Sequence, residues 1–133
     1  NDTYIVDSGE YILQRINTGI FTNPEKLMEN VVNVTEFLRG KIEKAGGNPD
    51  RETLTVIKTS DGNNIYTAKN GQVYRVYKYI PDSVSISECP GLDHLYNAAK
   101  GFGRFQSMLS DYPADSLFEV IPDFHNTPKR FDT

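Results

Sequence analysis

The sequence NDTYIVDSGEYILQRIN (residues 1–17) carries the clearest signal of the fold of this chain. Two runs within it, 3–6 and 10–16, are rich in Tyr, Ile, Leu and Val, as β-strands are. The Asp-Ser-Gly between them favours a tight turn. The stretch therefore predicts a β-hairpin at the start of a sheet.

Side chains alternate between the two faces of a strand, so the second run has two sets of neighbours. One face carries Tyr11, Leu13 and Arg15, and the other carries Ile12, Gln14 and Ile16. Two interpretations of Arg15 are open. It is either an edge-strand residue whose charged end reaches solvent over its apolar stem, or a functional cation.

The next segment, NPEKLMENVVNVTEFLRGKIEKAGG (23–47), has helix signals at both ends. Asn23 is the expected N-cap, Pro24 suits the first helical position, and two glycines follow the last apolar residue. We expect a helix over about 24–45. An apolar stripe, which predicts packing against the sheet, comprises Leu27, Val31, Val34, Leu38 and Ile42. Glu29 and Glu36 lie at its flank, and periodicity does not say whether either points inward.

Three further runs at 54–59, 65–68 and 73–80 have the composition of strands. They are joined by segments that contain Asp-Gly and Asn-Gly, the dipeptides typical of tight hairpin turns. The order of elements predicts an α+β fold, with an antiparallel meander of about five strands and one helix inserted after the second. Pro81 marks the end of the last strand.

The composition changes after residue 81. Apolar residues at helical spacing predict a helix over about 92–110, although Gly101 and Gly103 weaken it. The tail, 116–133, has no strand or helix periodicity and is expected to be irregular. We therefore divide the chain into a lobe, 1–81, and the start of a further lobe, 82–133. Both ends look cut, and the uncovered apolar face of the second helix predicts self-association.

Composition limits the partners. The chain has 14 basic and 18 acidic residues, and its Lys and Arg residues are scattered, which argues against nucleic acid. No apolar run approaches the roughly 20 residues that cross a membrane, and the start lacks the features of a signal peptide. A single Cys suits a reducing compartment. We expect a cytoplasmic protein.

Six segments together resemble a known family. They are NDTYIV (1–6), YILQRIN (11–17), NPEKLMENVVNVTEFL (23–38), YRVYKYI (74–80), GFGRFQSMLSDYP (101–113) and IPDFHNTPKRF (121–131). Their order is similar to the beginning of the aminoglycoside phosphotransferase superfamily, in the branch of the N-acetylhexosamine 1-kinases. Some members of that branch are labelled mucin-desulfating proteins. The resemblance implies a protein-kinase-like N-terminal lobe, followed by the first helix of the next lobe.

The resemblance assigns roles to charged residues. A basic residue of the third strand binds ATP phosphates in such lobes and is held by a Glu of the following helix. Arg15 takes the first role here, which suits a forked, permanently charged donor. Glu29 takes the second, with Glu36 in reserve.

It also implies where the rest of the nucleotide lies. Asn1, Asp2 and Thr3 correspond to the end of the loop over the phosphates. Adenine is expected against the backbone of the segment that leaves the last strand, Tyr79, Ile80 and Pro81. Apolar walls of the site, or ordinary core, are Val6 and either Ile12 or Leu13.

The implied function is ATP- and Mg²⁺-dependent phosphorylation of the anomeric hydroxyl of an N-acetylhexosamine, with a nucleotide and a small sugar as ligands. Transfer needs a His-x-Asp-x-x-x-x-Asn loop, which these 133 residues lack, because Asp93 and His94 stand in the wrong order. This chain alone is therefore not expected to catalyse transfer, and the metal ligands are expected outside it. A non-catalytic kinase-like binding module is the alternative.

A sulfatase acting on 6-sulfated N-acetylglucosamine of mucin is a weaker alternative. Sulfatases carry their modified Cys in Cys-x-Pro-x-Arg, whereas Cys89 is followed by Pro-Gly-Leu-Asp and is expected to be a loop thiol. His125 is interpreted as a structural residue or as one near the sugar or nucleotide. His94 and His125 have no neighbours at ligand spacing, so no metal site is expected.

Overall fold

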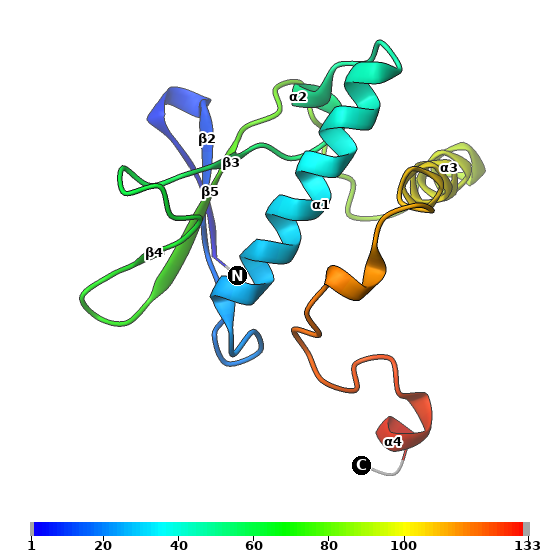
Figure 1. The fold of residues 1–133 in the computed structure, drawn as a ribbon. Coiled ribbons are helices and arrows are strands. Elements are labelled where there is room, and N and C mark those ends of the chain that lie inside the picture. The colour runs from blue at the N-terminus through cyan, green and yellow to red at the C-terminus, as the bar shows by residue number, and fades with distance from the viewer. Residues whose placement is uncertain (1, 132–133) are drawn as a thin grey trace.

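The computed structural model describes residues 2–131 and shows an α+β fold (Figure 1). A five-stranded antiparallel sheet contains β1 (Thr3–Val6), β2 (Tyr11–Arg15), β3 (Val56–Ile57), β4 (Tyr66–Thr67) and β5 (Val73–Lys78). The helices are α1 (Pro24–Lys44), α2 (Pro49–Glu52), α3 (Leu92–Met108) and α4 (Thr127–Phe131). The predicted fold class is confirmed, with the antiparallel sheet and packed helix expected of a kinase-like N-terminal lobe.

The order of the strands differs from a simple meander. It is β1-β2-β5-β3, and β4 also pairs with β5. β5 is therefore central, since it pairs with β2 along one edge and with β3 and β4 along the other. The meander was wrong because α1 carries the chain from β2 across to the far edge of the sheet. There, β3 and β4 contribute only two residues each.

α1 forms where its punctuation predicts. The Asn23 side chain accepts a hydrogen bond from the Lys26 amide at 3.0 Å, which caps the first turn. Gly46, at φ +75°, takes the left-handed conformation that ends a helix. The helix begins at Pro24 as expected and ends at Lys44, one residue before the predicted limit.

The core lies between α1 and one face of the sheet. Its buried members are Ile16, Met28, Val73 and Tyr77, and Met28 has no exposed surface at all. Met28 is not a member of the predicted apolar stripe; it directly follows Leu27, the first residue of that stripe. Leu38 and Ile42 of that stripe are buried further along the helix.

The second part of the chain packs on the other side of α1, so that α1 lies between the sheet and the segment 92–131 (Figure 1). The Asn30 side chain donates to the Phe118 carbonyl at 2.8 Å and accepts from the Phe118 amide at 3.0 Å. The rings of Phe37 and Tyr112 meet edge to face with centroids 5.1 Å apart. These contacts dock the tail on α1.

Two short helices were not predicted. α2 begins after Asn48, whose side chain accepts from the Asp50 amide at 3.1 Å, and Pro49 occupies its first position. α4 lies in the tail that was expected to be irregular, and the Asn126 side chain accepts from the Lys129 amide at 3.2 Å. Both are single turns that a local cap initiates, too short for apolar periodicity to reveal. Among residues 2–131, no helix combines the length and apolar character that a membrane crossing requires.

Candidate functional site

A row of polar side chains crosses three strands on the face of the sheet that carries α1. Gln14 of β2 lies opposite Arg75 of β5, and its Oε1 accepts from Arg75 Nε at 2.9 Å and from Nη2 at 2.7 Å. Gln14 Nε2 donates to Thr3 Oγ1 of β1 at 2.8 Å. We call these three residues the Thr3–Gln14–Arg75 row.

The apolar neighbours of the row place it beside the core. Ile12 and Ile16 flank Gln14 on the same face, and Val73 and Tyr77 flank Arg75. Arg75 also reaches α1 directly, since its Nη1 lies 3.6 Å from Met28 Sδ. The guanidinium is thus enclosed between sheet and helix and is only partly exposed.

The groups around this guanidinium are neutral. Its central carbon lies 5.1 Å from the centroid of the Tyr77 ring, a favourable cation–π contact. Burial raises the pKa of the Tyr77 phenol, and the charge of Arg75 partly offsets that rise. No carboxylate of residues 2–131 forms an ion pair with Arg75. Among residues 2–131, the groups in contact with this half-buried positive charge are thus an amide, a thioether and an aromatic face.

Arg15, the cation expected to bind phosphate, lies on the opposite face of the sheet. Its Nε donates to Asp2 Oδ2 at 2.8 Å, and its side chain is 41% exposed. Adjacent residues of a strand point to opposite faces, so the step from Gln14 to Arg15 changes the side of the sheet. The structure thus brings Arg15 together with Asp2, another expected site residue, but away from α1.

Glu29 does not pair with Arg15. Its Oε2 lies 2.9 Å from Lys26 Nζ, and Lys26 lies over the ring of Phe118 at 3.6 Å from the centroid. Glu29 therefore belongs to the side of α1 that faces the tail. Glu36 is exposed further along the helix. The expected pairing is absent because Met28, one position before Glu29, is the residue that α1 turns toward the sheet.

The remaining expected residues are divided between the two faces. Asn1 lies outside the described residues. Thr3 belongs to the row, and Ile12, one of the expected apolar walls, packs against the core on the same face. Val6 and Leu13 instead line an apolar cavity of about 770 Å³ on the opposite face, together with Tyr4, Ile57 and Val76.

The segment that leaves β5 is held by backbone and side-chain contacts. The Tyr79 amide donates to the Glu10 carbonyl at 2.8 Å, which extends the pairing of β5 with the hairpin. The Pro81 carbonyl accepts from Arg51 Nη1 of α2 at 2.9 Å. Ile80 lies between these two anchors. The segment expected to meet adenine is therefore anchored at both ends.

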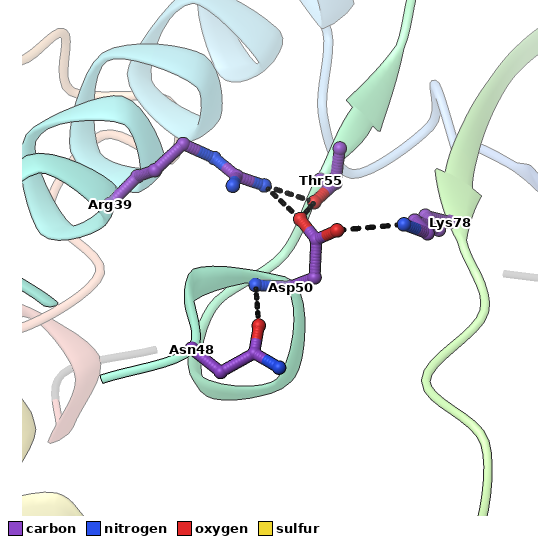
Figure 2. Close-up of polar contacts among 5 residues, drawn as sticks. All are labelled: Arg39, Asn48, Asp50, Thr55 and Lys78. Atoms are coloured by element: carbon purple, nitrogen blue, oxygen red, sulfur yellow. Dashed lines mark hydrogen bonds and ion pairs between the residues drawn. The ribbon is translucent and has the colours of Figure 1, made fainter. Parts of the chain in front are cut away.

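An ion cluster around Asp50 holds the same end of β5 (Figure 2). Asp50 Oδ1 accepts from Arg39 Nη2 of α1 at 2.8 Å, and Oδ2 accepts from Lys78 Nζ of β5 at 2.7 Å. The hydrogen bonds from Lys78 and Arg39 lower the pKa of the Asp50 carboxyl to about 2. Asp50 thereby ties α1 and β5 to α2. Sequence reasoning missed it because the three residues are distant in the chain.

Cys89 and His125 have local contacts only. The exposed Cys89 thiol donates to the Gly91 carbonyl at 3.3 Å, as expected of a loop thiol. The His125 ring packs edge to face on Phe124 with centroids 4.9 Å apart. Within residues 2–131, no three His, Cys, Asp or Glu side chains gather closely enough to hold a metal ion.

Arg75 is the functional candidate that sequence reasoning overlooked. The signal was present, because alternation in VYRVYK (73–78) places Arg75 between Val73 and Tyr77 on one face. A charge flanked by apolar residues on the face that packs against a helix is unusual.

Comparison of the chain with known protein families finds no match.

Proposed function

We propose that this chain is the nucleotide-binding lobe of an ATP-dependent sugar phosphotransferase, one that phosphorylates the anomeric hydroxyl of an N-acetylhexosamine. One observation carries the proposal. α1 is inserted between β2 and β3 and packs on the face of the sheet that holds a cationic row, while β5 leads into an anchored exit segment. This is the arrangement expected of a kinase-like lobe.

Under this proposal the two ends of the nucleotide meet different parts of the sheet. Adenine pairs with backbone groups of residues 79–81, which the Glu10 carbonyl and Arg51 keep in place. The phosphates extend toward the Thr3–Gln14–Arg75 row, where the Arg75 guanidinium supplies positive charge. Catalysis in such enzymes is mainly positioning and electrostatic stabilisation, so a lobe of this kind contributes orientation.

Mg²⁺ would neutralise the phosphates in such a reaction. The described residues do not supply a metal-binding cluster, so they do not fit this role and we assign no step to the ion. The His-x-Asp-x-x-x-x-Asn pattern that would supply the base and a metal ligand does not occur in the 133 residues. These groups would come from a further lobe of the complete protein.

The missing loop also favours a second function, a kinase-like module that binds nucleotide without transferring phosphate. The reading frame that encodes the chain distinguishes the two. A His-x-Asp-x-x-x-x-Asn motif downstream supports the enzyme, and a downstream lobe without that motif supports the module.

Phosphorus NMR of the full-length protein tests the proposal directly. The protein is incubated with ATP, Mg²⁺ and either N-acetylglucosamine or N-acetylgalactosamine, and a parallel assay measures sulfate release from 6-sulfated N-acetylglucosamine. A sugar 1-phosphate resonance is expected. ATP binding without that resonance would favour the module, and release of sulfate without phosphate transfer would favour a sulfatase.

A further inference from the structure

We propose that Arg75, oriented by Gln14, binds the phosphate groups of the nucleotide, in the role that sequence reasoning gave to Arg15. This inference deepens the proposed function and rests on it for the identity of the ligand. The chemistry is that of a linear polyphosphate. Three properties of the Arg75 guanidinium suit it to this role: its charge, its free donors and its fixed orientation.

The charge of Arg75 is not neutralised within the described part of the chain. Arg15, Arg39 and Arg104 each pair with a carboxylate, of Asp2, Asp50 and Glu52 respectively. Arg75 is more enclosed than an ordinary surface residue, yet its contacts are an amide, a thioether and an aromatic ring. A partly desolvated cation without a counter-ion is unfavourable, and an anion bound beside it would remove that penalty.

Arg75 also retains hydrogen-bonding capacity. A guanidinium has five N–H donors. Nε and one hydrogen of Nη2 are engaged with Gln14, and one hydrogen of Nη1 is engaged with Met28. The remaining hydrogens, one on each terminal nitrogen, have no partner among residues 2–131. Two terminal N–H groups on one planar fork match the spacing of phosphate oxygens.

The orientation of this fork is fixed before any ligand arrives. Gln14 accepts two hydrogen bonds from Arg75, and its own amide donates to Thr3, so the Gln14 side chain is held at both ends. A neutral amide positions the guanidinium without neutralising it, as a carboxylate would. Thr3 is exposed at the edge strand, so the row is open to solvent at its β1 end. Because Gln14 lies between Thr3 and Arg75, a polyphosphate reaches the remaining N–H groups through the partly exposed surface of Arg75 itself.

The test is an NMR titration of the ¹⁵N-labelled chain with ATP, pyrophosphate and adenosine, separately. It compares the parent chain with Arg75→Gln, Arg75→Lys and the matched control Arg15→Gln. We expect Arg75→Gln to weaken ATP and pyrophosphate binding about tenfold or more, because a charged hydrogen bond is lost. Arg75→Lys should recover part of that loss. Adenosine binding should not change, and Arg15→Gln should bind all three ligands as the parent does.

Several outcomes would overturn the proposal. Unchanged pyrophosphate affinity in Arg75→Gln, or a loss confined to Arg15→Gln, would remove Arg75 from the site. Equal loss of adenosine and pyrophosphate binding would indicate a general structural defect rather than a lost phosphate contact. If the parent chain binds pyrophosphate through Arg75 but not ATP or adenosine, the anion site stands and the proposed nucleotide function fails. Absence of pyrophosphate and ATP binding by the parent chain would reject Arg75 as an anion site, and phosphorus NMR of the full-length protein would then decide the proposed function.

Discussion

Gln14 and Arg75 lie directly opposite each other on β2 and β5, and one amide oxygen accepts two hydrogen bonds from the guanidinium, at 2.9 and 2.7 Å. The pairing is unusual in that the partner of a half-buried cation is neutral. A carboxylate at the same position would satisfy the charge as well as the donors. Replacing the neutral Gln14 amide by a carboxylate therefore tests whether the uncompensated charge of Arg75 contributes to anion binding.

Gln14→Glu should weaken anion binding without destabilising the folded chain. The new carboxylate lies within hydrogen-bond distance of Arg75 and neutralises it, so pyrophosphate affinity should fall about tenfold or more. The free energy of unfolding should not decrease. Calorimetric titration measures the affinity, and urea denaturation measures the stability. Unchanged or tighter binding in Gln14→Glu would contradict a role for the uncompensated charge.

The row explains why sequence reasoning found the fold but not the residues. The hairpin, the helix with its caps and the long final strand follow from local periodicity and turn chemistry, and each lies within a few residues of its predicted place. The Gln14–Arg75 pairing instead depends on the register between β2 and β5, and the two residues are 61 positions apart in sequence. Gln14 and Arg15 are adjacent in β2, so their side chains lie on opposite faces of the sheet, and an error of one residue selects the wrong face.

Global contacts account for the other differences. β5 became central only because both short strands, β3 and β4, pair with it, and no local pattern reports strand order. The family resemblance assigned Glu29 as the partner of Arg15. Met28 is the residue enclosed by the sheet, and the tail takes the side of α1 that carries Lys26 and Glu29. Predicting which residues of α1 face the sheet requires knowing that the sheet covers one side of the helix and the tail covers the other.

Met28→Ala should be among the most destabilising substitutions in the chain. The side chain is fully buried between α1 and the sheet, and its loss leaves a cavity beside Ile16, Val73 and Tyr77. Such truncations lower the free energy of unfolding by about 2–5 kcal/mol. Urea denaturation measures it. Met28→Leu, which conserves volume, should lose less than about 1.5 kcal/mol, and a similar loss in both variants would argue against the cavity explanation.

The exposed apolar residues of α3 predict that the isolated chain self-associates through this helix. Leu92 is 83% exposed and Phe102 is 73% exposed, and Leu95 and Tyr96 lie between them. Sedimentation should show a mass that rises with concentration. A Leu95→Ser, Phe102→Ser double variant should shift the chain toward monomer, whereas Tyr66→Ser on the sheet should not. A concentration-independent monomer would refute the prediction.

Asn30→Ala should release the tail from α1 without unfolding the sheet. The variant loses both hydrogen bonds to the backbone of Phe118, each of which contributes about 1 kcal/mol. Hydrogen exchange of the Phe118 amide should become faster, and proteolysis of the tail should increase. Asn33→Ala, at an exposed position of the same helix, is the matched control. Equal protection of Phe118 in the two variants would show that other contacts hold the tail.

The Asp50 cluster should make stability depend on acidic pH in a specific range. The hydrogen bonds from Lys78 and Arg39 lower the folded-state pKa of Asp50 from 3.8 to about 2. A lowered pKa means that the folded chain favours the carboxylate. The stabilisation is therefore complete above the unfolded value, declines as pH falls below about 4, and is lost near pH 2. Asp50→Asn removes this contribution at every pH.

Thermal denaturation of the parent chain and of Asp50→Asn over this range measures the effect. The difference in Tm should be constant at neutral pH and narrow between about pH 4 and pH 2, whereas other carboxyl groups titrate in both proteins and cancel. Added salt should reduce the difference at neutral pH, because these ion pairs are partly exposed. Asp61→Asn, in the turn after β3, removes a charge without removing the cluster. A difference in Tm that persists undiminished at pH 2 would show that Asp50 acts by packing rather than by charge.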